Sequence, residues 1–118
     1  MYEATVTEYF SGAHQLRGYK GKCENLHGHN WKVSVTVSSS RLDKTGMVID
    51  FGILKAGLRE LLNRLDHAYL NEIPWFKKNN PTSENVAKFI YNSVKKKNRN
   101  LKSVSVWENE NSCATYME

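Results

Sequence analysis

Three of the four histidines in this chain, His14, His27 and His29, have a spacing that would bring them together on one face of a small sheet. Side chains of an extended strand alternate between its two faces, so His27 and His29 project together while Gly28 leaves space for a close neighbour. Three neutral imidazoles with no fourth protein ligand hold Zn²⁺ and leave one coordination position open. We therefore expect a catalytic zinc site. The alternative is that all three are ordinary core or surface histidines.

The chain has 118 residues, which is enough for one domain with its own core and few enough that oligomerisation would help to bury apolar surface. We expect residues 1–118 to form a single domain. The sequence contains no apolar run long enough to cross a membrane and no secretion signal, so we expect no membrane partner and a cytoplasmic location. Because that compartment is reducing, we expect Cys23 and Cys113 to be free thiols, and we assign Cys113 no role beyond packing.

The net charge of +5 raises the question of a nucleic-acid partner. Between Lys77 and Lys102, eight lysines and arginines stand against the single acid Glu84, so the excess forms one local patch. Four of these cations lie within residues 95–99, where a helix is expected to end and where cations interact favourably with unpaired carbonyls. We expect a solvated helix end and no nucleic-acid partner. A polyanion site is the alternative.

The hydrophobic pattern of the first half predicts two strands and a helix. Apolar and polar residues alternate over Tyr2–Phe10 and Trp31–Val37, as in half-buried strands. A turn at 40–46 and a short extended piece follow. From Phe51 to Leu65 the apolar period is helical, with Asp50 placed to cap the helix.

The second half predicts one more helix and two more strands. A loop with both prolines of the chain is followed by a helix capped by Thr82 or Ser83. Two strands, near Val104–Val106 and at Cys113–Met117, are joined by a turn at 109–111. The buried face of the helix is expected to carry Val86, Phe89, Ile90 and Val94. We therefore predict an α+β fold with a four-stranded antiparallel sheet and two helices in the order ββααββ.

Parity along the strands also places polar side chains on the buried side. The three histidines share the parity of the apolar residues in their strands, and so does Glu108. Unpaired buried imidazoles and carboxylates cost several kcal/mol, so they need a metal and a polar ligand as partners. Glu8 has the same inward parity, and nothing in the pattern explains it.

Five segments spread almost from end to end form a joint pattern: Phe10–His14, Cys23–Asn30, Leu65–Asn71, Asn80–Asn85 and Glu108. Together they resemble the 6-pyruvoyl-tetrahydropterin synthase superfamily. Within it, the short Cys-x-x-x-His-Gly-His spacing resembles the bacterial 6-carboxy-tetrahydropterin synthases of queuosine biosynthesis, whereas the pyruvoyl enzymes typically have a longer gap.

The resemblance implies the tunnelling fold, in which sheets of several subunits close an oligomeric barrel. The usual assembly is a hexamer, a dimer of trimers with active sites between subunits. The resemblance also implies the substrate, 7,8-dihydroneopterin triphosphate, which is converted to 6-carboxy-5,6,7,8-tetrahydropterin with release of acetaldehyde and triphosphate. Electrons are rearranged within this substrate, so no redox cofactor is needed, and the chain has no G-x-G-x-x-G fingerprint.

Roles for single residues follow from the resemblance. His14, His27 and His29 would hold Zn²⁺, which acts as a Lewis acid at the side-chain hydroxyls of the substrate. Cys23 would be the general base, because a nearby dication lowers the pKa of a thiol and supplies thiolate. The alternative for Cys23 is a fourth zinc ligand in a closed structural site.

The resemblance also suggests an acid–base pair and a ring anchor. His67 would transfer protons while Asp66 fixes its tautomer. Adjacent residues do not face each other on a helix, so the pair is expected where the helix ends; a helix-capping pair is the alternative. Glu108 would anchor the pterin ring by accepting two hydrogen bonds, and its alternative is a surface acid on an edge strand.

Glu24 leaves the product open. A folate branch of the superfamily uses a glutamate at Glu-x-x-His-Gly-His spacing to give 6-hydroxymethyl-dihydropterin, and Glu24 has that spacing beside Cys23. A solvated loop acid is the other interpretation. Arg17, Lys20 and Lys22 are weak candidates for binding the triphosphate. A more remote hypothesis is a non-catalytic basic module stabilised by structural zinc.

Overall fold

The computed structural model of the chain describes residues 1–18 and 25–118. Cys23 and Glu24, the two candidate bases, lie outside the described residues, as do Lys20 and Lys22. In chain order the elements are β1 (Tyr2–His14), β2 (His27–Ser39), α1 (Phe51–Leu62), β3 (Ala68–Tyr69), the 3₁₀ turn η2 (Leu70–Glu72), α2 (Pro74–Lys78), α3 (Ser83–Lys95), β4 (Leu101–Asn109) and β5 (Ser112–Met117).

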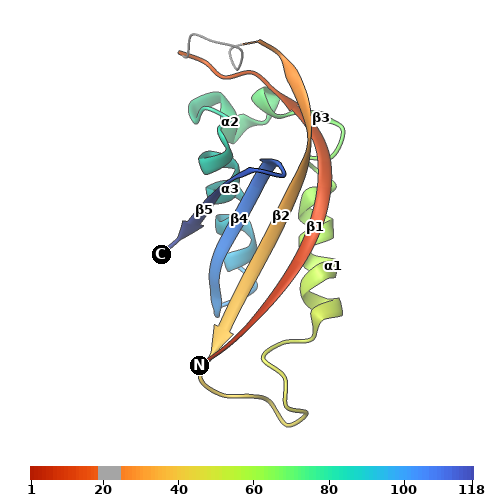
Figure 1. Ribbon diagram of the computed structural model, residues 1–118, viewed down its shortest axis with the longest axis vertical. Helices are drawn as coiled ribbons and strands as arrows, with labels where there is room; N and C mark the ends of the chain where they lie inside the picture. The colour runs from red at the N-terminus through yellow and green to blue at the C-terminus, as the bar shows by residue number, and fades with distance from the viewer. Residues whose placement is uncertain (19–24) are drawn as a thin grey trace.

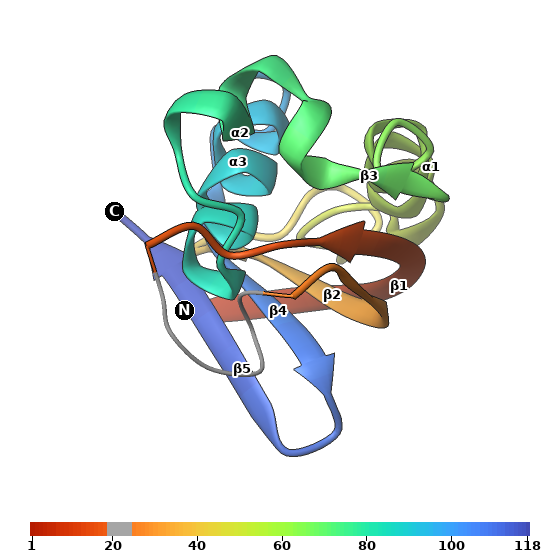
Figure 2. The same ribbon diagram turned by 90° about the horizontal axis from the view of Figure 1, so that it is seen from above.

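The strands form one sheet in the order β3-β1-β2-β4-β5 (Figure 1). The pairs β1–β2, β2–β4 and β4–β5 are antiparallel, whereas the short β3 runs parallel to β1. Within residues 1–18 and 25–118, the three α-helices cover the same face of the sheet and none lies on the opposite face (Figure 2). The predicted α+β architecture is confirmed.

In the long β1–β2 hairpin, side chains alternate between the two faces of the sheet without interruption. The two strands pair in register from Tyr2 opposite Ser39 to His14 opposite His27, with no bulge between them. A bulge would have turned every later side chain to the other face. His14 and His27 therefore share the helix-covered face with the core residues of their strands.

The core lies between this face and the helices. Trp31 is fully buried, and its ring is stacked parallel to that of Phe10 at 5.7 Å between centroids. The His14 ring lies against Trp31 edge-on, at 4.9 Å. Burial of such aromatic surface is a major part of the stability of a small domain. The histidines thus sit on the end of a packed core rather than on a loop.

Side-chain caps set where the two long helices begin. Asp50 accepts a hydrogen bond from the backbone N–H of Gly52 at 2.7 Å, which confirms it as the cap of α1. Thr82 accepts from the N–H of Asn85 at 3.1 Å, so Thr82 rather than Ser83 caps α3. None of the helices in residues 1–18 and 25–118 is long and apolar enough to cross a membrane.

The connection between α1 and α3 contains more structure than its sequence indicates. The loop expected around Pro74 is instead the short helix α2, with Pro74 in its first turn, where a missing N–H breaks no helical hydrogen bond. The two-residue strand β3 lies just before it and pairs with Gly12 and Ala13 of β1. The described sheet thus has five strands, one of them parallel, where four antiparallel strands were predicted, and the helices number three rather than two. The four long strands and the two long helices keep the predicted ββααββ order.

Three local expectations need correction. The apolar stripe extends to Leu65, but α1 ends at Leu62; Leu65 lies in the following turns and is still fully buried. The extended piece expected just before Phe51 is not a strand. Cys113 is a free thiol, as expected, but it is exposed on β5 and does not pack in the core.

The helix α3 ends at Lys95, inside the basic segment where its end was expected. The Lys95 ammonium donates hydrogen bonds to the backbone carbonyls of Arg99 at 2.8 Å and Leu101 at 3.2 Å. These carbonyls belong to the connection to β4 and to its first residue, so Lys95 ties the end of the helix to the start of that strand.

Candidate metal centre and active site

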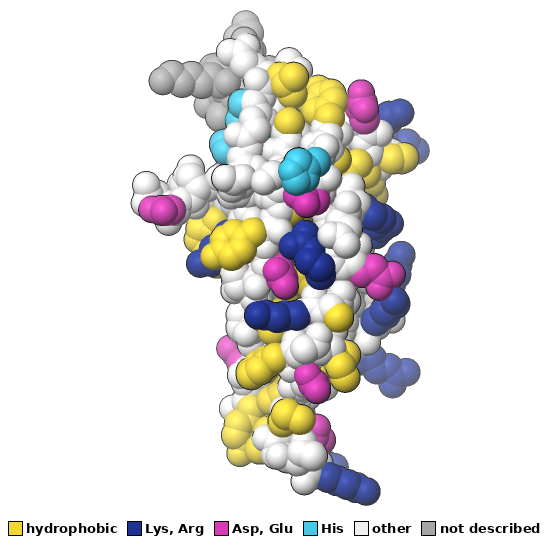
Figure 3. Space-filling model, turned by 90° about the vertical axis from the view of Figure 1, so that its right-hand side faces the viewer, with side chains coloured by type: hydrophobic (Ala, Val, Ile, Leu, Met, Phe, Trp, Pro, Cys, Tyr) yellow, Lys and Arg dark blue, Asp and Glu magenta, His cyan; other side chains and the backbone are white. Residues whose placement is uncertain are grey.

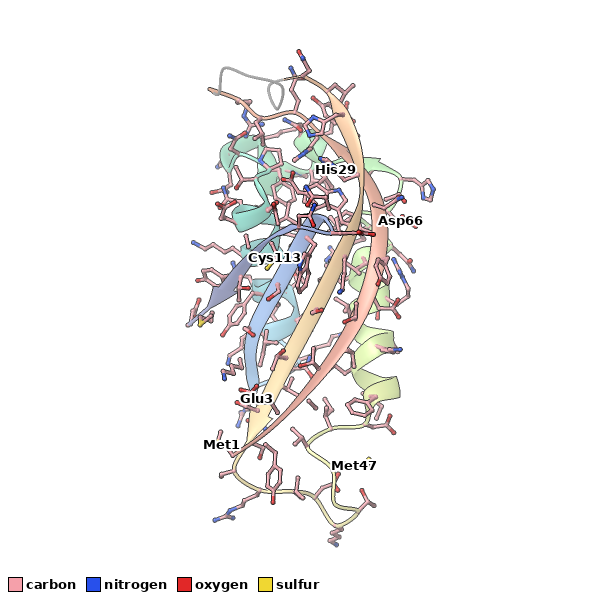
Figure 4. The ribbon with its side chains drawn as sticks, viewed as in Figure 1. Met1, Glu3, His29, Met47, Asp66 and Cys113 are labelled. Atoms are coloured by element: carbon pink, nitrogen blue, oxygen red, sulfur yellow. The ribbon has the colours of Figure 1, made fainter. Side chains whose placement is uncertain are left out.

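The three histidines meet at one end of the β1–β2 hairpin. His14 ends β1 opposite His27, which begins β2, and His29 follows on the same face. Their candidate ligand nitrogens all lie within 4.8 Å of one another. The ring centroids are 4.5 Å apart for His14 and His27, and 4.7 Å apart for His27 and His29. Figure 4 shows His29 on β2, near the end of the hairpin where the three histidines meet.

Backbone carbonyls orient two of these rings. The Nδ1 atom of His14 lies 2.6 Å from the carbonyl oxygen of Pro81, and Nδ1 of His27 lies 2.7 Å from that of Asn25. A carbonyl only accepts, so each Nδ1 carries the proton and each Nε2 presents a lone pair. Nevertheless, these two Nε2 atoms are 2.9 Å apart. Two lone pairs at that distance repel each other unless a cation lies between them.

Burial favours the neutral form of this cluster. His14 is fully buried, and desolvation lowers its pKa from the usual 6.5 although the Pro81 carbonyl and Glu108 act in the opposite direction. Desolvation also lowers the pKa of His29, with Glu108 again opposing. The His29 Nε2 atom is buried and has no hydrogen-bond partner in the described part of the chain. The contact of 3.5 Å between this atom and Glu108 Oε2 is therefore not an ion pair near neutral pH.

These features fit a divalent metal ion. A metal would satisfy the unpartnered His29 Nε2 and would remove the repulsion between His14 and His27. Neutral imidazole donors suit Zn²⁺ and related transition metals. The group of possible ligands within the described ranges consists of the three histidines. Cys23, the possible fourth ligand, lies outside those ranges, so the choice between a catalytic and a closed site stays a prediction.

Glu108 lies beside this cluster. Its Oε1 atom accepts a hydrogen bond of 2.7 Å from the Ser83 hydroxyl, and its Oε2 atom faces His29. Ser83 is the first residue of α3, so the helix and β4 together hold the carboxylate. β4 is flanked by β2 and β5, which excludes the alternative that Glu108 is an acid on an edge strand. The carboxylate is partly accessible, with 23% of the side chain exposed.

Glu8, whose inward parity had no explanation, has a partner in the structure. The Arg59 guanidinium of α1 lies 3.7 Å from the Glu8 carboxylate and donates a hydrogen bond of 2.7 Å to the Tyr9 carbonyl. Glu8 thus belongs to the packing of α1 against β1 and not to the metal cluster.

Asp66 and His67 follow α1, at the helix end where the pair was expected. The Ser11 backbone N–H donates to Asp66 Oδ1 at 2.9 Å, and the His67 N–H donates to the Ser11 carbonyl at 2.5 Å. The hydrogen bond from Ser11 is the largest cause that lowers the pKa of Asp66 from 3.8, so this group is a carboxylate near neutral pH. Its Oδ2 atom lies 3.3 Å from His67 Nδ1. His67 has a φ of +57°, a left-handed conformation.

The acid–base pair and the histidine cluster are separate within one chain. Over residues 1–18 and 25–118, no hydrogen bond or ion pair links Asp66 or His67 to the three histidines. Figure 3 shows histidine side chains at two distinct places on the surface, and Figure 4 places Asp66 at the margin of the sheet. Both His29 and His67 line one shallow hollow of about 530 Å³. His67 is 83% exposed toward solvent.

Arg17 is not free to bind a phosphate as expected. Its guanidinium donates a hydrogen bond of 2.5 Å to the carbonyl oxygen of Phe76, a core residue of α2. Because the guanidinium is engaged in this hydrogen bond, the contact weakens the proposal that Arg17 binds the triphosphate.

Comparison with known proteins identifies the family. A family model described as 6-pyruvoyl tetrahydropterin synthase matches residues 3–118, almost the whole chain. The chain belongs to this family. The resemblance inferred from the sequence motifs is therefore confirmed, and membership makes the chain an enzyme of the tetrahydropterin synthase type.

Two curated relatives and one solved structure define its place in the family. The 6-carboxy-5,6,7,8-tetrahydropterin synthase of a Synechocystis species is 43% identical over 113 residues, which cover 91% of this chain and 86% of the relative. The protein of the same name from Haemophilus influenzae is 32% identical and both chains are covered completely. The structure of Caenorhabditis elegans 6-pyruvoyl tetrahydropterin synthase superimposes with a TM-score of 0.91 at 30% identity, covering 99% of this chain and 95% of that one.

Three groups that shape the site of this family member left little signal in the sequence. The carbonyls of Asn25 and Pro81 orient histidine rings, and a backbone carbonyl has no residue-type pattern that could reveal it. Ser83 was expected as one of two candidate caps of a helix, yet its hydroxyl holds Glu108. The Ser or Thr at the start of a helix was a usable signal, but it did not tell which of two neighbours had which role.

Proposed function

We propose that this chain is a zinc-dependent 6-carboxy-5,6,7,8-tetrahydropterin synthase of queuosine biosynthesis. It would convert 7,8-dihydroneopterin triphosphate to 6-carboxytetrahydropterin with release of acetaldehyde and triphosphate. The names of the Synechocystis and Haemophilus relatives support the product. The observation that carries the proposal is the convergence of three imidazole nitrogens beside a held carboxylate, because a metal next to a ring anchor is what this chemistry needs.

His14, His27 and His29 would hold the zinc ion, which supplies Lewis acidity at the side-chain hydroxyls of the substrate. The protein contribution is orientation. The Pro81 and Asn25 carbonyls keep two Nδ1–H groups bound, so the Nε2 lone pairs stay directed into the cluster before the ion arrives. Preorganisation of this kind is a general feature of metal sites whose ligands are fixed by an outer layer of hydrogen bonds.

Glu108 would bind the pterin ring by accepting hydrogen bonds from the ring amino group and the neighbouring N–H. Ser83 supports this role because its hydroxyl fixes the carboxylate at Oε1. The distance of 3.5 Å from Oε2 to His29 supports placing the ring close to the metal ligands, with the substrate side chain extending over them. Bidentate recognition by a carboxylate is strong and selective for this ring edge.

His67 would transfer protons with Asp66 as its orienting partner. The ionised Asp66 accepts from His67 Nδ1, which leaves the other ring nitrogen for the substrate. Because the His67 side chain is largely exposed, we place its substrate in a site shared with another subunit, in a hexamer built as a dimer of trimers. The long edge of β1 beyond its two residues paired with β3 also supports a barrel that covers that edge.

Cys23 would remove the proton from the side-chain carbon of the substrate, and it lies outside the described residues. Substitution tests it directly. Cys23→Ala should retain zinc and bind pterin but lose turnover, which metal analysis, pterin titration and a rate assay measure separately. A fully active Cys23→Ala enzyme would remove the thiolate base from the mechanism. Loss of zinc from this variant would make Cys23 a metal ligand instead.

A second candidate is 6-pyruvoyl-tetrahydropterin synthase activity. The close superposition on the Caenorhabditis elegans structure favours it, whereas the higher identity to the Synechocystis 6-carboxy enzyme favours our proposal. Incubation of the zinc-loaded protein with 7,8-dihydroneopterin triphosphate separates them by product. We expect 6-carboxytetrahydropterin and acetaldehyde in equal amounts. Mainly 6-pyruvoyltetrahydropterin would favour the second candidate, and mainly 6-hydroxymethyl-dihydropterin would implicate Glu24.

A further inference from the structure

The chain beyond His14 is held by two asparagine side chains. The Gln15 N–H donates to Asn71 Oδ1 at 2.8 Å, and Asn71 Nδ2 donates back to the Gln15 carbonyl at 2.7 Å. Two residues on, the Arg17 N–H donates to Asn80 Oδ1 at 2.9 Å, and Asn80 Nδ2 donates to the Arg17 carbonyl at 3.0 Å. Each carboxamide therefore binds both backbone groups of one residue.

These carboxamides take the place of a neighbouring strand. A side-chain amide carries a donor and an acceptor side by side, as a peptide group does. β3 pairs with β1 only at Gly12 and Ala13, and the asparagines bind the backbone at the next positions where a paired strand would continue. Asn71 comes from η2, directly after β3, and Asn80 from the segment between α2 and α3. At this edge the backbone groups of Gln15 and Arg17, beyond His14, are thus paired with side-chain carboxamides and not with a neighbouring strand.

The second clamp is adjacent in sequence to a contact of the metal cluster. Asn80 precedes Pro81, whose carbonyl binds Nδ1 of His14 at 2.6 Å. The Asn80 carbonyl in turn accepts from Asn85 Nδ2 at 2.9 Å, which ties this segment to the first turn of α3. Two consecutive residues therefore hold this region: Asn80 binds the backbone of Arg17, and Pro81 binds the ring of His14. A shift of the Asn80 segment would displace the Pro81 carbonyl from His14.

The clamped residues contribute little to the core. Gln15 and Arg17 are exposed, and the hydrogen bonds that hold them lie at the surface. A contact that serves only stability would be expected to secure buried apolar groups, whereas these clamps secure an exposed strand extension next to a buried ligand. Their effect should therefore be seen in the geometry of the metal centre more than in unfolding.

We propose that Asn71 and Asn80 are positioning residues of the metal centre. By fixing the backbone on the far side of His14, they keep the Pro81 carbonyl on Nδ1 and keep Nε2 directed at His27. This inference rests on the proposed metal site and adds two residues that act on it through the backbone. Loss of the Asn80 clamp has the larger effect, because Asn80 is bonded to Pro81 directly.

The test compares Asn80→Ala with Asn79→Ala. Asn79 is the adjacent asparagine, and its side chain donates to the Trp75 carbonyl at 2.9 Å within the end of α2. Zinc affinity is measured by competition with a chromophoric chelator, and thermal unfolding is followed on the metal-free proteins. We expect Asn80→Ala to bind zinc roughly 10- to 100-fold more weakly, as for outer contacts of metal ligands in general, and Asn79→Ala to match the wild type.

Two further variants, Asn80→Asp and Asn71→Ala, test the two clamps independently of Asn80→Ala. Asn80→Asp retains an acceptor for the Arg17 N–H but loses the donor, so its zinc affinity should lie between those of the wild type and Asn80→Ala. If Asn80→Ala does not fold, Asn71→Ala and Asn80→Asp give the same measurement. Unchanged zinc affinity in the folded clamp variants overturns the inference, as does a loss matched by an equal loss in Asn79→Ala. A wild-type protein that binds no zinc contradicts the proposed function itself.

Discussion

The histidine cluster and the Asp66–His67 pair are both expected to do chemistry, but the fold builds them in opposite ways. The cluster lies on two strands of one hairpin, and its His14 ring is fully buried. The pair lies on a turn at the margin of the sheet, and the His67 side chain is 83% exposed. One chain thus brings together the three candidate metal ligands, whereas the candidate proton-transfer group, His67, faces outward.

The way each region is held explains the difference. Carbonyls bind two of the three rings of the cluster, those of His14 and His27, so these side chains are oriented directly. In the pair, the backbone of Ser11 binds the side-chain carboxylate of Asp66 and the backbone N–H of His67, and so stabilises the left-handed φ of His67. The imidazole of His67 stays accessible to a second molecule. We infer that the metal centre is assembled by folding and the complete active site by association.

The largest expected effect comes from removing a ligand. His27→Ala should lose nearly all bound zinc and all measurable turnover, because two imidazoles are a poor zinc site. His67→Ala should keep a full complement of zinc and lose about 10²- to 10⁴-fold in kcat, as expected for a general acid–base group. Metal analysis and rate assays on both variants measure this contrast. Zinc loss in His67→Ala would show that the two regions are not independent.

Mixed oligomers test whether the metal centre and the His67 of one active site come from different chains. When His27→Ala and His67→Ala chains are co-expressed, a shared site can combine an intact metal centre from one chain with an intact His67 from another. We expect part of the wild-type activity to return, although each variant alone is inactive or nearly so. Persistent inactivity of purified mixed oligomers would place both regions in the same chain's active site.

A smaller effect is expected at Glu108, the carboxylate beside the histidine cluster. Glu108→Gln should weaken binding of an unreactive pterin by about 10- to 100-fold, since a hydrogen-bonded charge is lost, and should leave zinc content unchanged. Ser83→Ala should weaken it by about 2- to 10-fold, because only the orientation of Glu108 changes. Calorimetric titration measures both. Equal pterin affinity in Glu108→Gln and the wild type would refute the anchor role.

The smallest effect is a difference in pH dependence. Burial lowers the folded-state pKa of His14 and His29, so the unfolded chain takes up protons first as the pH falls below about 6.5. The metal-free protein should lose stability from that pH downward. The pKa of Asp66 is lowered from 3.8, so its contribution is present above that pH and is lost below it. Thermal unfolding against pH measures both windows, and Asp66→Asn should change only the lower one.

Much of the metal centre could be predicted because its residues are close in sequence and lie on regular strands. The parity of β1 and β2 held through their whole length, and the pair Asp66–His67 was correctly expected at a helix end. Contacts between distant segments could not be predicted. Glu8 finds Arg59, and Arg17 binds the Phe76 carbonyl rather than remaining free. Each such contact depends on where helices pack, which no local pattern encodes.

The amino-acid sequence by itself determined the family, the order of the four long strands and two long helices, and the face on which the three histidines lie, because side-chain alternation and motif spacing are local properties. Only the tertiary structure decided that Thr82 caps α3 while Ser83 holds Glu108, that carbonyls of Asn25 and Pro81 orient the rings, and that the acid–base pair stands apart. The contacts of Pro81 with His14 and of Ser83 with Glu108 join segments 67 and 25 residues apart, and such distances are set by packing of the whole core.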